Sequence, residues 1–299
     1  MPRLLLTGAA GFVGRPLASF LELQGFDVVR LARGIPGQGS GGAIFWDPDG
    51  GVLRKEDFEG FDAVVHLAGE PLSFGRWNGS KRSQILYSRT AGTYLLSTVL
   101  SETLQPPKIF LSASAVGFYG DRGEEVLTEE SGAGRGFLAS VCCEWERACR
   151  PIQNRGARTV QARFGMVLGL NGGALKKMVP AYRLGLGGRL GTGKQWISWV
   201  ALDDLVRALG FLLSSDRIEG PVNIVSPNPV RQEDFSHTLA SLLRRPELFS
   251  LPAWLLKLRF GLVAEELLLS SARVEPKKLL SAGFSFQFPQ LREALLKAL

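Results

Sequence analysis

Three glycines near the start of the chain have the spacing of a phosphate-binding loop. The run TGAAGFVG at residues 7–14 follows a short apolar stretch and opens an amphipathic one. In such a strand–turn–helix unit the glycines make a tight turn, let the backbone approach a pyrophosphate and pack the helix on the strand. The helix N-terminus adds unpaired N–H groups and a partial positive charge. We therefore expect dinucleotide contacts at Gly8, Gly11, Phe12, Val13 and Gly14.

The end of the second expected strand distinguishes the two nicotinamide dinucleotides. In NAD-specific units an acidic side chain about 20 positions past the loop binds the ribose 2′-hydroxyl, whereas arginine there accommodates the 2′-phosphate of NADP. This chain has Ala32 and Arg33 at that point, and Asp27 lies too early. A guanidinium can bind a phosphate through two hydrogen bonds. The sequence favours NADP over NAD, with a solvated strand-end charge as the alternative for Arg33.

Hydrophobic periodicity places these residues in an α/β fold. Short apolar runs closed by glycine predict strands, and longer stretches with leucines at helical spacing predict helices between them. Strand, helix and strand in immediate succession form the unit of a parallel sheet. The expected strands cover residues 3–7, 26–32, 61–69, 108–112, 159–168 and 222–225, and the expected helices cover residues 13–24, 84–102 and 138–154.

We therefore predict a Rossmann-like, doubly wound parallel sheet with helices on both faces and a smaller C-terminal substrate lobe. Residues 1–170 are expected to form the dinucleotide-binding domain and residues 171–299 the lobe. The two interleave, because a strand near residues 222–226 returns to the sheet. The glycine- and proline-rich stretch 34–42 is expected to be a loop near the cofactor.

The composition fits a globular enzyme and argues against several other classes. Hydrophobic residues make up 45% and charged residues 21% of the chain, and neither a membrane-spanning run nor a signal peptide is visible, so we expect a cytoplasmic protein. Clustered Cys142, Cys143 and Cys149 make a poor disulfide framework, and two histidines without a CxxC pair argue against a metal site. The charge of +7 is scattered, so we expect neither nucleic-acid nor membrane partners.

Several longer motifs occur in order along the whole chain. They are TGAAGFVG at 7–14, DAVVHLAGEPL at 62–72, RW at 76–77, SR at 88–89, SASAVGFYG at 112–120, the segment 163–205, GPVNIVSPNPV at 220–230 and PKKLLSAGFSFQFP at 276–289. With these motifs the chain resembles the extended short-chain dehydrogenase/reductase superfamily of the NAD-dependent epimerase/dehydratase type. Within it, the chain is similar to the branch named epimerase family protein.

The resemblance implies a Rossmann domain with a C-terminal substrate lobe, and it implies where NADP is bound. Its cofactor positions correspond to Ala32, Arg33, Leu67, Ala68, Gln84, Arg89 and Arg163. The first four agree with the reasoning from the residues, because they follow strands, and open α/β sheets bind ligands at the carboxyl ends of their strands. Gln84, Arg89 and Arg163 rest on the resemblance alone. A related group of proteins carries a cell-division-inhibitor label.

The stretch that should carry the acid/base pair of the superfamily lacks it. Related enzymes place Tyr-x-x-x-Lys on a helix, where lysine lowers the tyrosine pKa so that the phenolate can move a proton during hydride transfer. Here residues 136–146 read GFLASVCCEWE. The aligned pairs are Phe137 with Val141 or Leu138 with Cys142. Neither pair can do that chemistry.

Three explanations of this gap stay open. In the first, Ser112 or Ser114 takes the place of the superfamily serine and a different acid/base acts from elsewhere, with Tyr119, Glu70, Cys142 and Lys194 as the candidates. In the second, the protein binds NADP without turnover and is a regulator. In the third, the reaction needs only weak acid assistance. The alternative roles are a wall beside the cofactor for Tyr119, a helix-core thiol for Cys142 and a solvated acid for Glu70.

Two further regions bear on the substrate. The glycine-rich segment 184–196 carries two cations and a tryptophan, so it is expected to wrap a small polar substrate, with a flexible hairpin as the alternative. Asp203 and Asp204 are expected to cap a helix and form salt bridges rather than act in catalysis. The leading hypothesis is an NADP-dependent oxidoreductase or epimerase-like enzyme with a small-molecule substrate, and a homodimer is left open.

Overall fold

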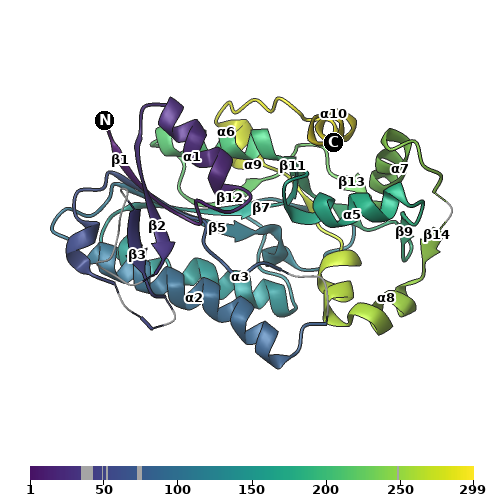
Figure 1. The fold of residues 1–299 in the computed structure, drawn as a ribbon, viewed down its shortest axis with the longest axis horizontal. Helices are drawn as coiled ribbons and strands as arrows, with labels where there is room; N and C mark the ends of the chain where they lie inside the picture. The colour runs from purple at the N-terminus through teal and green to yellow at the C-terminus, as the bar shows by residue number, and fades with distance from the viewer. Residues whose placement is uncertain (35–42, 49, 52, 73–75, 248) are drawn as a thin grey trace.

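A seven-stranded sheet forms the centre of the molecule (Figure 1). The computed structural model describes residues 1–34, 43–48, 50–51, 53–72, 76–247 and 249–299. The strand order is β12-β7-β5-β4-β1-β2-β3, and every neighbouring pair is parallel. The strands are β1 (Arg3–Thr7), β2 (Asp27–Arg33), β3 (Ala43–Trp46), β4 (Ala63–His66), β5 (Ile109–Ala115), β7 (Arg158–Phe164) and β12 (Gly220–Ile224). The predicted Rossmann-like α/β class is confirmed.

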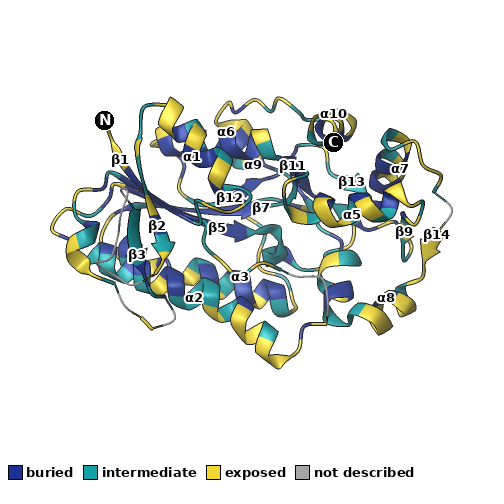
Figure 2. Cartoon of the chain, viewed as in Figure 1, coloured by how far each residue is buried: buried dark blue, intermediate teal, exposed yellow. Residues whose placement is uncertain are grey.

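Helices cover both faces of this sheet, as Figure 1 shows. Leu4 and Leu6 point to the face packed by α1 (Gly14–Leu23) and α6 (Leu202–Ser214). Leu5 points to the opposite face, where α2 (Gly79–Ser101) and α4 (Arg150–Asn154) pack. Successive side chains of a strand alternate between faces, so strands buried on both sides read as unbroken apolar runs. Figure 2 shows the central strands β5 and β7 largely in the dark blue of buried residues.

The helix predicted over residues 138–154 is two helices, α3 (Phe137–Arg147) and α4. Proline has no N–H to donate to the preceding turn and is tolerated at the start of a helix. Pro151 lies at the start of α4. The strand predicted over 159–168 also divides, into β7 and β8 (Met166–Leu168), with Gly165 between them. A side chain on Gly165 would lie 2.6 Å from the Ser198 carbonyl oxygen, so the chain passes there only as glycine.

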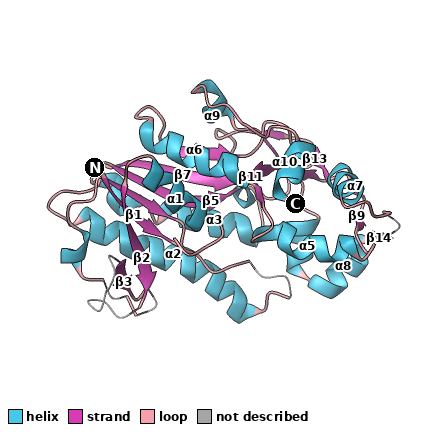
Figure 3. Cartoon of the chain, turned by 45° about the horizontal axis from the view of Figure 1, so that its top comes forward, coloured by secondary structure: helices cyan, strands magenta, loops and turns pink. Residues whose placement is uncertain are grey.

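A second core lies beyond the strand ends, on the right in Figure 1 and also visible in Figure 3. It unites β8 and β11 (Trp199–Ala201) with α5 (Gly173–Arg183), α7 (Gln232–Leu242) and α10 (Leu291–Ala298). The remaining elements are β6 (Val126–Leu127), β9 (Gly188–Leu190), β10 (Trp196–Ile197), β13 (Val230–Arg231), β14 (Phe249–Leu251), α8 (Ala253–Phe260), β15 (Arg273–Val274), α9 (Lys277–Ser281), the short helices η1 (Lys55–Phe58) and η2 (Val116–Tyr119), and the π-helical η3 (Ala264–Leu268).

Some expectations are only partly addressed by these elements. Of the expected loop at 34–42, residues 35–42 lie outside the described residues. The division near residue 170 stays a prediction, as do the cytoplasmic location and the homodimer. Within the described part of the chain, no helix combines the length and apolar character needed to cross a membrane. In that same part, no group of three or more histidine, cysteine, aspartate or glutamate side chains is arranged to hold a metal ion.

Candidate functional site

The loop between β1 and α1 has room for backbone only at its three glycine positions. Gly8 has a φ of +69°, and a Cβ there would lie 3.0 Å from the Leu67 carbonyl carbon. A Cβ on Gly14 would overlap the carbonyl oxygen of Gly8. The Gly11 N–H donates to that same oxygen at 2.9 Å. Glycine at these three positions therefore closes a tight turn against the end of β4, which leaves exposed backbone at the helix N-terminus for an anionic ligand.

Thr7 holds this loop against β4. Its Oγ1 accepts hydrogen bonds from the backbone N–H groups of Leu67 at 3.0 Å and Ala68 at 3.1 Å. The same oxygen lies 2.8 Å from Nδ1 of His66, its register partner on β4. The structure therefore brings the predicted Leu67–Ala68 positions to the glycine loop. The sequence reasoning missed Thr7 and His66 as functional positions, although a polar residue ending each buried strand was a usable signal.

His66 continues a buried chain of hydrogen bonds toward α3. Its Nε2 lies 3.0 Å from Oγ1 of Thr93, which also accepts from the indole N–H of Trp145 at 3.0 Å. Because Thr7 Oγ1 already accepts two backbone N–H groups, we assign its hydroxyl proton to the bond with Nδ1, so Nε2 carries the ring proton. Burial lowers the pKa of His66 to about 4, and the ring is neutral at pH 7.

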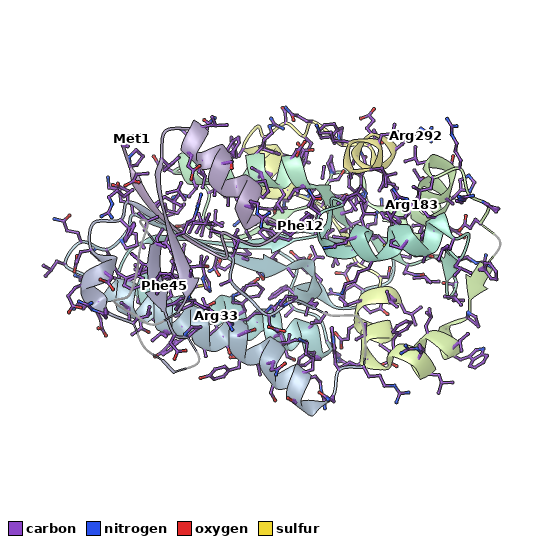
Figure 4. The ribbon with its side chains drawn as sticks, viewed as in Figure 1. Met1, Phe12, Arg33, Phe45, Arg183 and Arg292 are labelled. Carbon is purple, nitrogen blue, oxygen red and sulfur yellow. The ribbon has the colours of Figure 1, made fainter. Side chains whose placement is uncertain are left out.

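Phe12 points away from the glycine loop, toward the second core. A Cβ on Gly172 would lie 2.5 Å from the Phe12 ring, and Gly169 and Gly173 lie against the same ring. Figure 4 shows Phe12 between the sheet and the elements of the second core. Val13 packs against the core beneath α1. At both predicted positions the side chain is therefore used for packing, and the backbone is what remains to contact a phosphate.

Arg33 is exposed at the carboxyl end of β2, where Figure 4 labels it. It is the register partner of Trp46 on β3, and Ala32 before it is half-buried. Arg30 lies three residues earlier on the same strand and pairs with Glu22 of α1 at 3.1 Å. The structure thus places Arg33 at the end of the strand next to β1, at the edge where the glycine loop lies.

Helix α2 brings Arg89 to the end of β4. A Cβ on Gly69 would lie 3.6 Å from the Arg89 side chain, and the guanidinium carbon lies 5.1 Å from the ring centre of Trp145. Burial lowers the pKa of Arg89, while the nearby Cys142 and Glu70 act in the opposite direction. The predicted Arg89 therefore lies at the strand ends, next to the predicted positions 67–70.

Two other predicted residues of this region have different surroundings. Gln84 is exposed on α2. The carboxylate of Glu70 forms an ion pair with Lys81 at 2.6 Å, and the Glu70 N–H donates to the hydroxyl of Ser88. This ion pair fixes the position of the carboxylate against α2. The arrangement therefore favours a structural role for Glu70.

A buried ion pair lies beneath Ser114. The Ser114 hydroxyl donates to Oε1 of Glu146 at 2.7 Å, and Arg163 donates to both oxygens of that carboxylate at 2.8 Å. Ser114 and Arg163 are register partners on β5 and β7, so their side chains leave the sheet on the same face. Burial alone would lower the pKa of Arg163, but its bonds to Glu146 and Tyr119 raise it above its usual value. Sequence reasoning missed Glu146, which lies one helical turn after Cys142.

Tyr119 is fully buried within the same network. Its hydroxyl accepts from Arg163 at 2.9 Å and lies 2.7 Å from Oδ1 of Asn223. Burial raises the pKa of Tyr119. A buried phenol that already has these partners cannot exchange protons with a ligand at the surface. The surroundings of Tyr119 and Arg163 therefore favour structural roles over the predicted catalytic and cofactor contacts.

The remaining candidates lie apart from one another. Burial raises the pKa of the Cys142 thiol to about 12, so it is protonated and packs under the end of β5. Lys194 is exposed in the turn before β10. The predicted salt bridge of Asp204 is confirmed by Arg207 at 3.0 Å, but the predicted helix cap is wrong. The buried Asp204 carboxylate instead accepts the backbone N–H groups of residues 287 and 288, at 2.7 and 2.8 Å.

Comparisons with known proteins agree with this fold. Residues 4–225 match the NAD dependent epimerase/dehydratase family, and residues 251–298 match a domain of unknown function (DUF1731). An epimerase family protein of Mycobacterium bovis is 37% identical over 290 residues, which span 97% of this chain and 95% of that protein.

Two solved structures are similar over the whole chain. The human epimerase family protein SDR39U1 with NADPH has a TM-score of 0.87 at 31% identity, covering 99% of this chain and 98% of that one. The nucleoside-diphosphate sugar epimerase from Corynebacterium glutamicum has a TM-score of 0.81 at 36% identity, covering 100% of this chain and 58% of that one. On the evidence of the family match and these relatives, the chain belongs to the NAD-dependent epimerase/dehydratase family, in the branch of the epimerase family proteins.

Proposed function

We propose that the protein binds NADP(H) at the strand ends and acts as an oxidoreductase or epimerase-like enzyme on a small polar substrate. The observation that carries this proposal is the glycine turn held by Thr7 against Leu67 and Ala68, with Arg33 at the end of the neighbouring strand. The NADPH in the human relative supports the same cofactor. The sugar nucleotide named for the Corynebacterium relative suggests one substrate class to test.

The residues present fit a dinucleotide. The backbone of Gly8 to Gly14 would hold the pyrophosphate, because its glycines close a tight turn at the N-terminus of α1, where side chains at Gly8 and Gly14 would meet other backbone atoms. Arg33 would bind the 2′-phosphate, and the segment after β4 with Arg89 would lie along the ribose and nicotinamide. A bound nicotinamide supplies hydride transfer.

Ser114 is the best-placed residue for proton transfer. When a substrate hydroxyl donates to Ser114 Oγ, the serine proton can pass to Glu146, to which it is already hydrogen-bonded. Arg163 orients the carboxylate through two bonds. This arrangement would replace the missing Tyr-x-x-x-Lys pair. Ser114 is only 2% exposed, so a substrate reaches it only after the elements around it move.

The test is a pair of fluorescence titrations followed by a turnover assay. We expect NADPH to bind more tightly than NADH. We then expect NADPH oxidation, or loss of label from a substrate carbon, with at least one member of a panel of carbonyl compounds and sugar nucleotides. Failure to bind either nucleotide would contradict the proposal.

A regulator that binds NADP(H) without turnover is the second candidate. It is favoured by the burial of Tyr119 and Ser114 and by the protonated Cys142, which leave each of these groups without access to a ligand in this structure. The same panel separates the two functions. Tight NADPH binding with no oxidation and no exchange of a deuterium label at the nicotinamide would favour the regulator.

A further inference from the structure

A carboxylate from the C-terminal part of the chain caps helix α3. Glu266, in the π-helical turn η3, accepts the backbone N–H of Phe137 on Oε1 at 2.8 Å and that of Leu138 on Oε2 at 3.0 Å. The first N–H groups of a helix have no partner within the helix, and a negative charge there is favourable. We call this pair of bonds the Glu266 cap.

Helix α3 has no cap of its own. Gly136 precedes it with no side-chain hydrogen bond, and its first turn holds no acidic residue. Gly136 has a φ of +115°, and a Cβ there would lie 2.6 Å from Oε1 of Glu266. The local sequence therefore supplies no partner for the first N–H groups of α3, and the glycine at position 136 leaves space for a carboxylate from another segment.

An apolar cluster reinforces the Glu266 cap. Phe260 and Val263, which flank the end of α8, pack with Trp77, Phe137 and Leu138. The rings of Trp77 and Phe137 meet edge to face at 5.9 Å. The cap and the cluster together join residues 258–268 to the start of α3. We call residues 258–268, which run from the last turn of α8 through η3, the α8 segment.

Movement of the start of α3 would also affect Glu146 and the surroundings of Ser114. A Cβ on Gly117, just after β5, would lie 3.4 Å from Cβ of Leu138, so the first turn of α3 packs on this strand end. Two turns further along the same helix, Glu146 accepts a hydrogen bond from the Ser114 hydroxyl. Because Leu138 and Glu146 belong to one continuous helix, a displacement of its first turn would also shift Glu146.

A cavity of about 400 Å³ opens beside the cap. Part of its wall is formed by Gly120, Asp121 and Arg135, which precede α3 in the sequence. Another part is formed by Glu266 of the α8 segment and by Lys257, which lies just before that segment. Since both sides supply the walls, the size of this cavity depends on how the α8 segment and α3 are held together.

We propose that Glu266 is a positioning residue that couples the α8 segment to α3, so that displacement of one moves the other and, through Glu146, the surroundings of Ser114. The inference rests on the cap geometry and does not depend on which nucleotide the protein binds. Because the coupled displacement is local, its test measures the opening of hydrogen bonds in these two segments rather than the free energy of unfolding of the whole protein.

Hydrogen exchange of the full chain tests the coupling. In Glu266→Ala we expect the amides of residues 137 and 138 to exchange roughly tenfold faster or more, because each loses a charge-assisted hydrogen bond. We expect faster exchange over residues 258–262 as well, although these residues precede η3, which carries the substitution. A purely local cap would change α3 alone, which would overturn the coupling.

Two further variants separate the effect of the Glu266 cap from other effects of substitution in this turn. Glu265→Ala is the matched control, since Glu265 is in the same turn but pairs with Lys257 at 3.1 Å and bonds to α8 rather than α3. It should leave the exchange of residues 137 and 138 unchanged. Glu266→Gln should give an intermediate rate, because its amide oxygen can accept only one of the two N–H groups in this geometry. Equal effects of Glu265→Ala and Glu266→Ala, or no effect of Glu266→Ala, would refute the proposal.

Discussion

Thr7 Oγ1 and His66 Nδ1 lie 2.8 Å apart on neighbouring strands, at the edge where the glycine loop begins. The pair links two backbone N–H groups after β4 to a buried chain that continues through Thr93 to the indole of Trp145 on α3. The position of the glycine loop therefore depends on a neutral imidazole. The loop and α3 are parts of one hydrogen-bonded unit.

The buried His66 predicts a loss of stability in mild acid. Its pKa is about 4 in the folded protein against 6.5 when exposed, so between these values only the unfolded chain takes up the proton. The stabilising contribution is complete above pH 6.5 and is lost as the pH falls toward 4. At about 1.4 kcal/mol per pH unit, the loss amounts to at most roughly 3.5 kcal/mol. Urea unfolding at pH 4.5, 5.5, 6.5 and 7.5 measures it.

The second histidine supplies the control for this pH dependence. His237 has a side chain 82% exposed, so His237→Gln should reproduce the wild-type pH dependence. In His66→Gln the slope between pH 4.5 and 6.5 should flatten, at the cost of lower stability at pH 7.5. A slope that is the same in both variants would show that carboxylates, rather than His66, cause the acid sensitivity.

Arg33 predicts selectivity for the 2′-phosphate. In Arg33→Asp the dissociation constant for NADPH should rise roughly 10- to 100-fold, as expected for the loss of a charge-assisted contact, while that for NADH should change little. Arg30→Asp is the matched control, because Arg30 lies on the same strand but pairs with Glu22. Fluorescence titration measures all four constants. Equal losses for both nucleotides in Arg33→Asp would refute the 2′-phosphate role.

The close packing around Gly14 predicts that a larger residue there lowers both the stability of the protein and its affinity for NADPH. In Gly14→Ala the new Cβ meets the Gly8 carbonyl, so the turn must open; we expect a loss of about 1–3 kcal/mol, as for other overpacked sites. NADPH affinity should fall with it. Gly25→Ala is the control, because Gly25 has a φ of +85° but no atom within 4 Å of a Cβ. It should cost about 1–2 kcal/mol and leave binding unchanged. Unimpaired NADPH binding in Gly14→Ala would contradict the phosphate-loop assignment.

Local patterns explain which elements the sequence could predict. The strands of the sheet interior were visible because burial on both faces leaves unbroken apolar runs such as Leu4 to Leu6. The edge strand β3 was missed, because it has four residues and directly follows a glycine-rich stretch. Helix α2 begins at Gly79 instead of Gln84, because its start is set by the Asn78 cap rather than by apolar periodicity.

Some residues of the candidate site could likewise be predicted from the sequence, and others could not. The glycine loop and the position of Arg33 at the end of β2 could be predicted from spacing, since both depend on neighbours in sequence. The partners of Ser114 could not, because Glu146 and Arg163 lie 32 and 49 positions away and meet it only through the packing of α3 on the sheet. The Glu266 cap joins residues more than 120 positions apart, and no local pattern indicates it.

The Ser114–Glu146–Arg163 group predicts unequal costs for two small substitutions. In Glu146→Gln the Arg163 guanidinium, only 3% exposed, loses its countercharge, and we expect a loss of about 3–5 kcal/mol, as for other broken buried pairs. In Ser114→Ala one hydrogen bond to the carboxylate is lost, while both bonds from Arg163 stay, so the loss should be about 2 kcal/mol. Urea unfolding at pH 7.5 measures both.

The same pair of variants separates structure from chemistry. Because Ser114→Ala leaves the ion pair intact, it should retain the fold and NADPH binding but lose most of any turnover found with the substrate panel. Glu146→Gln should lose stability and turnover together. If Ser114→Ala destabilises the protein as much as Glu146→Gln, the serine is a structural member of the network. Turnover that is unchanged in a stable Ser114→Ala protein would exclude the proposed proton route and require an acid/base elsewhere.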